Sequence, residues 1–269
     1  MSRTDAATAG VDITVPHPAR MYDYWRGGKD NYAADRRAAD AIAAELPDVA
    51  IVAQAHHRFV QRAVRHQVVE LGIRQFVVIG CGIPTGASTH TTAQALDPRT
   101  RVVYADPDPI VAVHSRALLV SHPRGVVEFV DGGIDDVSAL LDDPLLSRVV
   151  DLREPVSFRV ASALWRLSDE GAAAVLDVLK DVMAPGSCLV ASHGTTDFDP
   201  EATRRAAEAG AANGVPQGTR GRDGFAEFFT GLDLVDPGVV PIVSWHPDED
   251  ETVRDPHTVS IYGGIGRKP

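Results

Sequence analysis

Residues 75–86, QFVVIGCGIPTG, decide the fold of this chain. They begin with a short apolar run at residues 76–79, rich in β-branched side chains, which is typical of a parallel strand buried on both faces. Glycines directly after such a strand allow a sharp turn and let a ligand approach the backbone without a Cβ in the way. Residues 88–96 then have the pattern of a helix, whose first N–H groups would face that ligand. The candidate cofactor-binding residues of the turn are Gly80, Cys81, Gly82, Pro84 and Thr85.

A second apolar run, residues 101–105, predicts the next strand, and it is followed by Asp106, Pro107 and Asp108. Nucleotide-binding folds place an acidic residue at this strand tip against ribose hydroxyl groups. The order of strand, glycine turn, helix, strand and acid therefore predicts a site for a nucleoside cofactor. The turn reads GxGxPT and lacks the third glycine of a GxGxxG turn, so the pattern disfavours a dinucleotide such as NAD.

Strands and helices continue to alternate along the rest of the chain. This alternation predicts an α/β, Rossmann-like fold with a seven-stranded, mostly parallel sheet flanked by helices, whose last two strands close as a hairpin. Ligands of such sheets bind beyond the carboxyl ends of the strands, which adds Asp131, Gly132, Gly133, Ile134 and Ser162 to the candidate cofactor-binding residues. The remaining strands are predicted at residues 126–130, 156–164, 187–192, 234–245 and 258–262, and helices at 33–46, 50–71, 169–183, 199–213 and 224–231.

The chain before the first strand divides into two parts. Residues 1–15 lack the apolar core of a signal peptide and are predicted to be a disordered leader. Residues 16–72 are predicted to form an N-terminal helical cap, and residues 73–269 the Rossmann-like domain. The helix at 50–71 is amphipathic, and its basic side chains are predicted to lie mostly on a solvated face. These side chains are His56, His57, Arg58, Arg62, Arg65 and His66.

Aromatic residues gather in residues 16–36, although they make up only 6% of the chain. One interpretation is a short helix that packs its aromatic rings on the main domain, with a turn at Gly27 and Gly28. The other is a lid over the cofactor site, because ligand pockets are often lined by aromatic rings and a few polar groups. The candidate substrate or lid residues are Tyr22, Tyr24, Lys29, Asn31 and Tyr32, together with Trp165.

Composition excludes several classes of function. The chain has 269 residues, 44% of them hydrophobic, and contains no apolar run of the length that a membrane helix needs. A net charge of −11 argues against nucleic-acid binding, which requires a basic face. Cys81 and Cys188 are the only cysteines, which fits a reducing cytoplasm and leaves no zinc or disulfide framework. We therefore expect a cytoplasmic protein that binds a small molecule and no metal.

Four segments resemble the actinobacterial S-adenosyl methyltransferase family once described as a domain of unknown function: PHPARMYDYWRGGKDNYAADR, QFVVIGCGIPTG, RVVYADPDPIV and MAPGSCLVASHG. The resemblance implies a class I methyltransferase fold with an S-adenosylmethionine pocket. By position, Gly80 and Gly82 would border the methionine and ribose, and Asp106 would bind the ribose hydroxyls. Pro107 and Asp108 would lie near the adenine, with the aromatic segment covering the pocket.

The chain departs from this family at three places around the implied pocket. Val78 stands where relatives have an acid that holds the amino group of the methionine moiety. Residues 132–134 replace an Ala-Asp-Leu pattern, and residues 164–166 a Leu-His-Phe pattern. Besides a methyltransferase acting on a small molecule, such as a secondary metabolite, two alternatives remain open. One is a binding protein that has lost catalysis, and the other is a cyclase or isomerase that transfers no methyl group.

The sequence specifies little about the chemistry. S-adenosylmethionine is already an activated donor, so a general base is more useful for a hydroxyl acceptor than for an amine. His193, after the fifth strand, and His90, after the glycine turn, are the candidates for such a base. For each, a structural histidine with satisfied hydrogen bonds is the favoured explanation. The sequence specifies neither the acceptor nor an oligomeric state.

Overall fold

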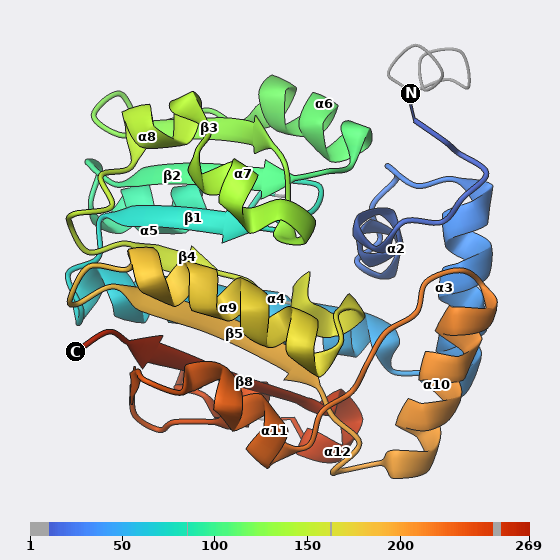
Figure 1. Ribbon diagram of the computed structural model, residues 1–269. Helices are drawn as coiled ribbons and strands as arrows, with labels where there is room; N and C mark the ends of the chain where they lie inside the picture. The colour runs from blue at the N-terminus through green and yellow to red at the C-terminus, as the bar shows by residue number, and fades with distance from the viewer. Residues whose placement is uncertain (1–10, 85, 162, 250–253) are drawn as a thin grey trace.

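The computed structural model describes residues 11–84, 86–161, 163–249 and 254–269. Its centre is a twisted sheet with the strand order β3-β2-β1-β4-β5-β8-β6, and β7 pairs with β8 (Figure 1). Among the described strands, β8 pairs antiparallel with β5, β6 and β7, and the other pairs are parallel, which confirms the predicted mostly parallel sheet flanked by helices. The strands are β1 Gln75–Ile79, β2 Arg101–Asp106, β3 Val126–Asp131, β4 Ser157–Arg159, β5 Cys188–Gly194, β6 Asp233–Leu234, β7 Val240–Pro241 and β8 Ile261–Arg267.

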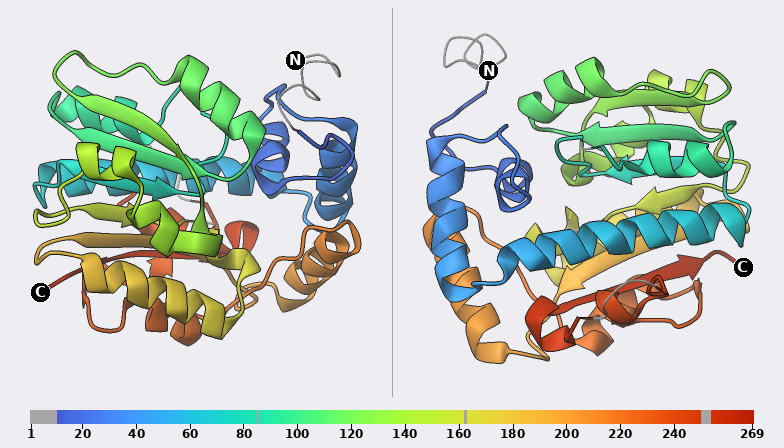
Figure 2. Two further views of the ribbon diagram at one scale, coloured as in Figure 1. Left: turned by 45° about the horizontal axis from the view of Figure 1, so that its top comes forward. Right: turned by 180° about the vertical axis from the view of Figure 1, so that it is seen from behind.

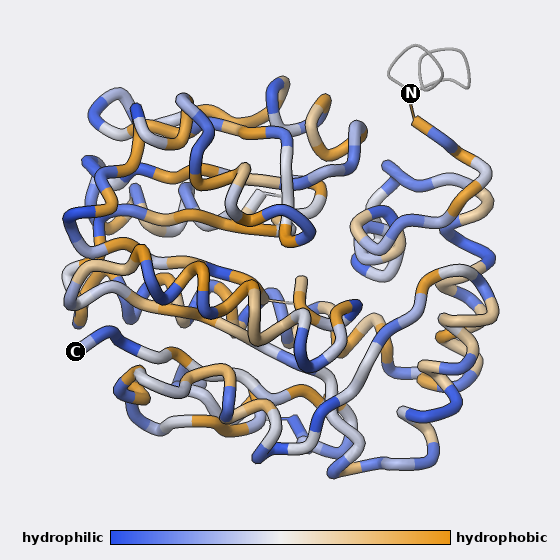
Figure 3. Tube along the Cα trace, viewed as in Figure 1, coloured by the Kyte–Doolittle hydropathy of each residue, from blue (hydrophilic) through white to orange (hydrophobic). Residues whose placement is uncertain are grey.

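Alternation along the strands divides the core into two layers. Successive side chains of a strand point to opposite faces, so Val77 and Ile79 of β1 pack on one side and Phe76 and Val78 on the other. The hydrophobic strands and the polar outer turns of the helices are visible in Figure 3. The Val77 face is covered by η1 Ile134–Asp136, α7 Val137–Leu141, α8 Pro144–Val149 and α9 Asp169–Val182, and the Val78 face by α4 Val49–Val69, α5 Thr89–Leu96 and α6 Pro109–Leu118.

Three helices stand beyond the carboxyl ends of the strands, and we call them the cap: α2 Pro18–Trp25, α3 Ala33–Glu45 and α10 Pro200–Ala212 (Figures 1 and 2). The helix α10 packs along α3, where Ala206 and Ile42 share one apolar cluster. An ion pair of 2.8 Å between Arg205 and Glu45 joins the same two helices. The cap therefore combines two distant segments of the chain, while α4 lies on the sheet and connects the cap to it.

Three of the predicted strands differ from the structure. The run at 156–164 stops pairing at Arg159 and continues as η2 Ala163–Arg166, because its neighbour β1 has already turned at Gly80. The run at 234–245 breaks into β6, β7 and η4 Ile242–Ser244, since Pro237 and Gly238, with φ of +83°, interrupt it. The run at 258–262 begins as α12 Pro256–Val259 before β8. The helix predicted at 224–231 is α11 Arg222–Ala226 followed by η3 Glu227–Phe229.

The first described residues, from Val11 onward, pack on the domain next to α6. Val11 is buried against Ile110 of α6, with Tyr32 and Ile83 packed beside it. Residues 1–10 of the expected leader lie outside the described part of the chain. None of the described helices is long and apolar enough to cross a membrane.

Candidate functional site

A cavity of 560 Å³ lies between the cap and the carboxyl ends of the strands, which is within the usual size range of small-molecule sites. Its lining comes from the glycine turn, α2, the first half of α4, the ends of β2 and β4, and the loop that follows α10. Most of the lining is apolar. The polar and aromatic side chains on it include His17, Tyr22, Trp25, Arg26, His56, His57, Gln61, Tyr104, Asp106, Arg159, Trp165 and Arg166.

The glycine turn is stabilised by the neighbouring strand. Gly80 and Gly82 both have φ of +68°, a region that L-residues other than glycine rarely adopt. The Gly80 N–H donates to the carbonyl oxygen of Ala105 at 2.9 Å, and the Gly82 N–H donates to Oδ2 of Asp106 at 2.9 Å. Both glycines line the cavity with Cys81 and Pro84, whereas Thr85 lies outside the described residues.

Asp106 is the acidic residue at the end of β2, and it faces the cavity from a buried position. Besides the bond from Gly82, its Oδ1 accepts the N–H of Asp108 at 3.0 Å. Burial raises the pKa of this carboxyl, and the two N–H donors oppose that rise by stabilising the charged form. Asp106 therefore fixes the glycine turn and still presents a carboxylate to a ligand.

Asp108 makes different contacts from Asp106. Its Oδ1 accepts the N–H of Ile110 at 2.7 Å and so caps α6. Its Oδ2 lies 3.2 Å from Nδ1 of His17 and 3.6 Å from Nε of Arg20, both from the cap segment. Asp108 is not part of the cavity lining, whereas Pro107 beside it is.

The other strand tips contribute less than the sequence predicts. Ile134 lines the cavity, but Asp131, Gly132 and Gly133 do not. Asp131 is exposed and forms an ion pair with Arg116. Gly133 packs so closely on Pro107 that an added Cβ would lie 3.0 Å from the ring. Ser162 lies outside the described residues.

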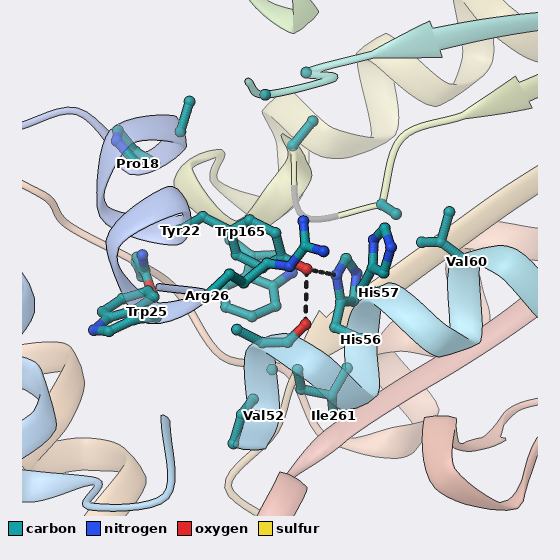
Figure 4. Close-up of a pocket in the computed structure, with 18 of the residues that line it drawn as sticks. Pro18, Tyr22, Trp25, Arg26, Val52, His56, His57, Val60, Trp165 and Ile261 are labelled. Atoms are coloured by element: carbon teal, nitrogen blue, oxygen red, sulfur yellow. Dashed lines mark hydrogen bonds between the residues drawn. The ribbon is translucent and has the colours of Figure 1, made fainter. Parts of the chain in front are cut away.

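Among the predicted lid residues, Tyr22 and Trp165 line the cavity. The Tyr22 hydroxyl donates to the carbonyl oxygen of Ala53 at 2.8 Å and lies 3.3 Å from Nδ1 of His56 (Figure 4). The Trp165 indole donates to the carbonyl oxygen of Ser192 at 3.1 Å. The other four predicted lid residues lie outside the lining: Tyr24 bonds to Asp40, Asn31 to Asp23, Tyr32 begins α3, and Lys29 is exposed.

The turn after α2 has a structural explanation centred on Asp23. Oδ2 of this buried carboxylate accepts the N–H of Asp30 and the side-chain amide of Asn31, each at 2.9 Å. Gly28 packs against the same carboxylate, and a Cβ there would lie only 1.9 Å from Oδ1 of Asp23. Gly27 adopts φ of +80°. The GGKDN sequence thus forms a turn that holds α2, and with it Tyr22, over the cavity.

The two predicted histidine candidates are enclosed by protein groups. His90 is buried, with Nδ1 2.9 Å from the Ser88 hydroxyl and 3.0 Å from the Tyr104 hydroxyl. His193 is fully buried, and its two ring nitrogens contact the Gly194 carbonyl and the Arg220 guanidinium. Burial lowers the pKa of His193 to about 4. Neither ring lines the cavity.

The prediction of a solvated basic face on α4 was wrong for His56, His57 and Arg62. His56 and Arg62 are buried, and His57 is half-buried and lines the cavity (Figure 4). Nε2 of His56 lies 2.9 Å from the Ser192 hydroxyl. Burial lowers the pKa of His56 to about 3 and that of His57 to about 4, so both rings are neutral at pH 7. A signal was present, because His56 follows Ala53 by three residues and precedes Val60 by four, on the apolar stripe of the helix.

The charge of the lining is strongly one-sided. Asp106 is its only carboxylate among the described residues, against the guanidinium groups of Arg26, Arg159 and Arg166. Arg166 forms an ion pair with Asp135, and Arg26 lies over the Tyr22 ring, 5.7 Å from its centre. No group of three or more histidine, cysteine or acidic side chains in the described chain is placed to hold a metal ion.

A mostly parallel sheet with this strand order, a glycine turn after β1 and an acid at the end of β2 define the class I methyltransferase fold. The model of the S-adenosyl methyltransferase family matches residues 4–269, and the chain belongs to this family. This confirms the resemblance seen in the sequence.

Several solved structures are similar to the chain. A DUF574 family protein from Streptomyces avermitilis is 40% identical, with a TM-score of 0.92 over 96% of this chain and 99% of its own. A Thermobifida fusca protein, provisionally described as a methyltransferase, is 34% identical, with a TM-score of 0.89 over 96% and 97%. Human N-acetylserotonin methyltransferase, solved with S-adenosylmethionine, is 12% identical and shares the fold, with a TM-score of 0.52 over 98% and 66%. No curated protein matches the chain.

Proposed function

We propose that this protein is an S-adenosylmethionine-dependent methyltransferase that acts on a small molecule held in the cavity between cap and sheet. The observation on which this rests is the contact between Gly82 and Asp106, which puts a glycine turn and a carboxylate side by side at the ends of two parallel strands. Membership of the S-adenosyl methyltransferase family supports the same conclusion.

The residues present fit the nucleoside part of the cofactor. Gly80 and Gly82 expose backbone without a Cβ, and each Asp106 oxygen accepts one N–H and keeps a lone pair for a ribose hydroxyl. Pro107 and Ile134 offer apolar surface beside that carboxylate. When bound, S-adenosylmethionine supplies an activated methyl group, so the protein has to position the acceptor and exclude water.

His57 is the residue that we assign to proton transfer when the acceptor is a hydroxyl. It lines the cavity, and burial, followed by the charges of Arg26 and Arg159, lowers its pKa to about 4. A neutral imidazole in contact with the cavity can accept a proton. The rings of His90 and His193 do not line the cavity, and both ring nitrogens of His193 contact protein groups. The apolar lining suits an acceptor with an aromatic or aliphatic body, as many secondary metabolites have. We place the protein in the cytoplasm, where the free thiols of Cys81 and Cys188 persist.

Calorimetric titration with S-adenosylmethionine and S-adenosylhomocysteine, with NAD as a control ligand, tests this proposal. We expect both sulfur nucleotides to bind the wild type and NAD not to bind. Asp106→Asn removes the charge that receives the ribose and should weaken binding by about 1.5–3 kcal/mol, roughly 10- to 100-fold. The control Asp142→Asn, at an exposed position after α7, should bind as the wild type does.

Two results would contradict the proposal. One is that neither sulfur nucleotide binds to folded wild-type protein, and the other is that Asp106→Asn binds them unchanged. Binding without methyl transfer to any acceptor would instead identify a binding protein or a non-methylating enzyme on the same fold.

A further inference from the structure

Arg159 is the one lining guanidinium for which the described parts of the chain provide no hydrogen bond and no ion pair. It is the last residue of β4 and lies in register with Val78 of β1 and Val190 of β5. Neighbouring residues in register point to the same face, so its side chain lies on the α4 side of the sheet, where Val78 and Val190 also pack. This is the side from which His56 and His57 approach the cavity.

The polar groups around Arg159 do not neutralise it. Burial keeps Cys81 protonated by raising its pKa, and it raises the pKa values of Tyr22 and Tyr104 to about 12. The nearby imidazole rings are neutral as well. Asp106, the carboxylate of the described lining, accepts the N–H groups of Gly82 and Asp108 and forms no ion pair with Arg159 among the described residues. A guanidinium remains charged at any physiological pH, and burying it without a counter-ion is costly.

The strand next to β4 contributes no charge at this point. Val78 of β1 lies in register with Arg159, so the guanidinium is the charged group at the paired ends of these two strands. This part of the cavity therefore favours an anion. Aliphatic side chains of Val52, Val60 and Ile261 lie on the same cavity, so the group next to the anion meets apolar surface.

We propose that Arg159 binds a carboxylate of the ligand at the carboxyl end of β4. The carboxylate has two sources, the amino-acid end of the sulfur nucleotide and an acidic acceptor. Both belong to the proposed function, and the inference rests on it. A planar guanidinium can donate two parallel N–H bonds to a carboxylate, and such a pair is strong in a site that excludes water.

Pairs of probes with and without a carboxylate test the proposal. S-adenosylhomocysteine is compared with 5′-methylthioadenosine, which lacks the whole amino-acid end, and 3-phenylpropanoate is compared with 3-phenylpropanamide, which differs in the carboxylate alone. Affinities are measured by calorimetry for wild type, Arg159→Met, Arg159→Lys and the control Arg153→Met, an exposed arginine paired with Asp151. The thermal midpoint of each variant without ligand establishes that it is folded.

We expect Arg159→Met to lose about 10- to 100-fold in affinity for a carboxylate probe and to bind its neutral partner unchanged. Arg159→Lys should retain part of the affinity, and Arg153→Met all of it. A loss confined to S-adenosylhomocysteine assigns the carboxylate to the cofactor, and a loss confined to 3-phenylpropanoate assigns it to the acceptor.

Failure of the inference can be separated from failure of the proposed function. If no sulfur nucleotide binds but 3-phenylpropanoate binds through Arg159, the methyltransferase proposal fails and the carboxylate site stands. If Arg159→Met binds every probe as the wild type does, the carboxylate site is refuted. The same conclusion follows, without any variant, if wild-type protein binds neither carboxylate better than its neutral partner.

Discussion

Replacing Gly28 by alanine should destabilise the turn that joins α2 to α3 in the cap. The new Cβ would lie 1.9 Å from Oδ1 of Asp23 and 2.3 Å from its Cγ, so the carboxylate must move. Moving it breaks the bonds that Asp30 and Asn31 donate to Oδ2. Hydrogen bonds to a charged group contribute about 1.5–3 kcal/mol each, so the loss amounts to about 3–6 kcal/mol. That is a large part of the roughly 5–15 kcal/mol that stabilises a typical domain.

The free energy of unfolding is measured by urea denaturation for Gly28→Ala and for the control Gly224→Ala. Gly224 lies in α11 with nothing within 4 Å of the added Cβ, so alanine there should be neutral or slightly stabilising. Because α2 holds Tyr22 on the cavity, Gly28→Ala should also weaken binding of S-adenosylhomocysteine. An unfolding free energy within 0.5 kcal/mol of the wild type, about the scatter of neutral surface changes, would show that Asp23 does not hold the turn.

Two further predictions follow from buried titratable groups. His56, His57 and His193 have an ordinary pKa of 6.5 and folded values of about 3, 4 and 4, so the unfolded chain binds more protons between pH 6.5 and 4. Stability should therefore fall as the pH drops through this window, and thermal midpoints of His57→Gln should fall less steeply than those of wild type. Burial raises the pKa of both Cys81 and Cys188. Iodoacetamide at pH 7.5 should therefore leave the native protein unmodified and should label both thiols in urea. Rapid labelling of Cys81 in the native protein would refute this.

Much of the fold could be predicted because its signals are local. Short β-branched runs followed by glycine or aspartate gave β1, β2 and β3 nearly to the residue, and Ser88 and Ser168 begin α5 and α9 as N-caps. The end of β4 could not be predicted in the same way. Its length is set by where the neighbouring strands stop, which is a property of the assembled sheet.

The cavity lining was predicted from the sequence where it depends on the backbone, and it was missed where it depends on the direction of a side chain. Gly80, Gly82 and Asp106 follow from strand-tip rules that hold for any parallel sheet. The histidines of α4 were assigned to solvent by their polarity, although their helical position places them on the apolar stripe. A polar residue on such a stripe needs a buried partner or a cavity, and His56 has the first while His57 has the second.

The segment after β2 shows why cap and cofactor site should be regarded as one unit. Asp106 and Asp108 are two residues apart, yet the first accepts from the glycine turn and the second faces His17 and Arg20 of the cap segment. Arg20 also lies 3.5 Å from Asp35 of α3, so a buried set of charges runs from the end of β2 into the cap. Charges of this kind contribute little when exposed, but removing one partner from a buried set is strongly destabilising. The position of the cap is therefore coupled to the end of β2, and we expect a ligand held by Asp106 to stabilise the closed cavity as well.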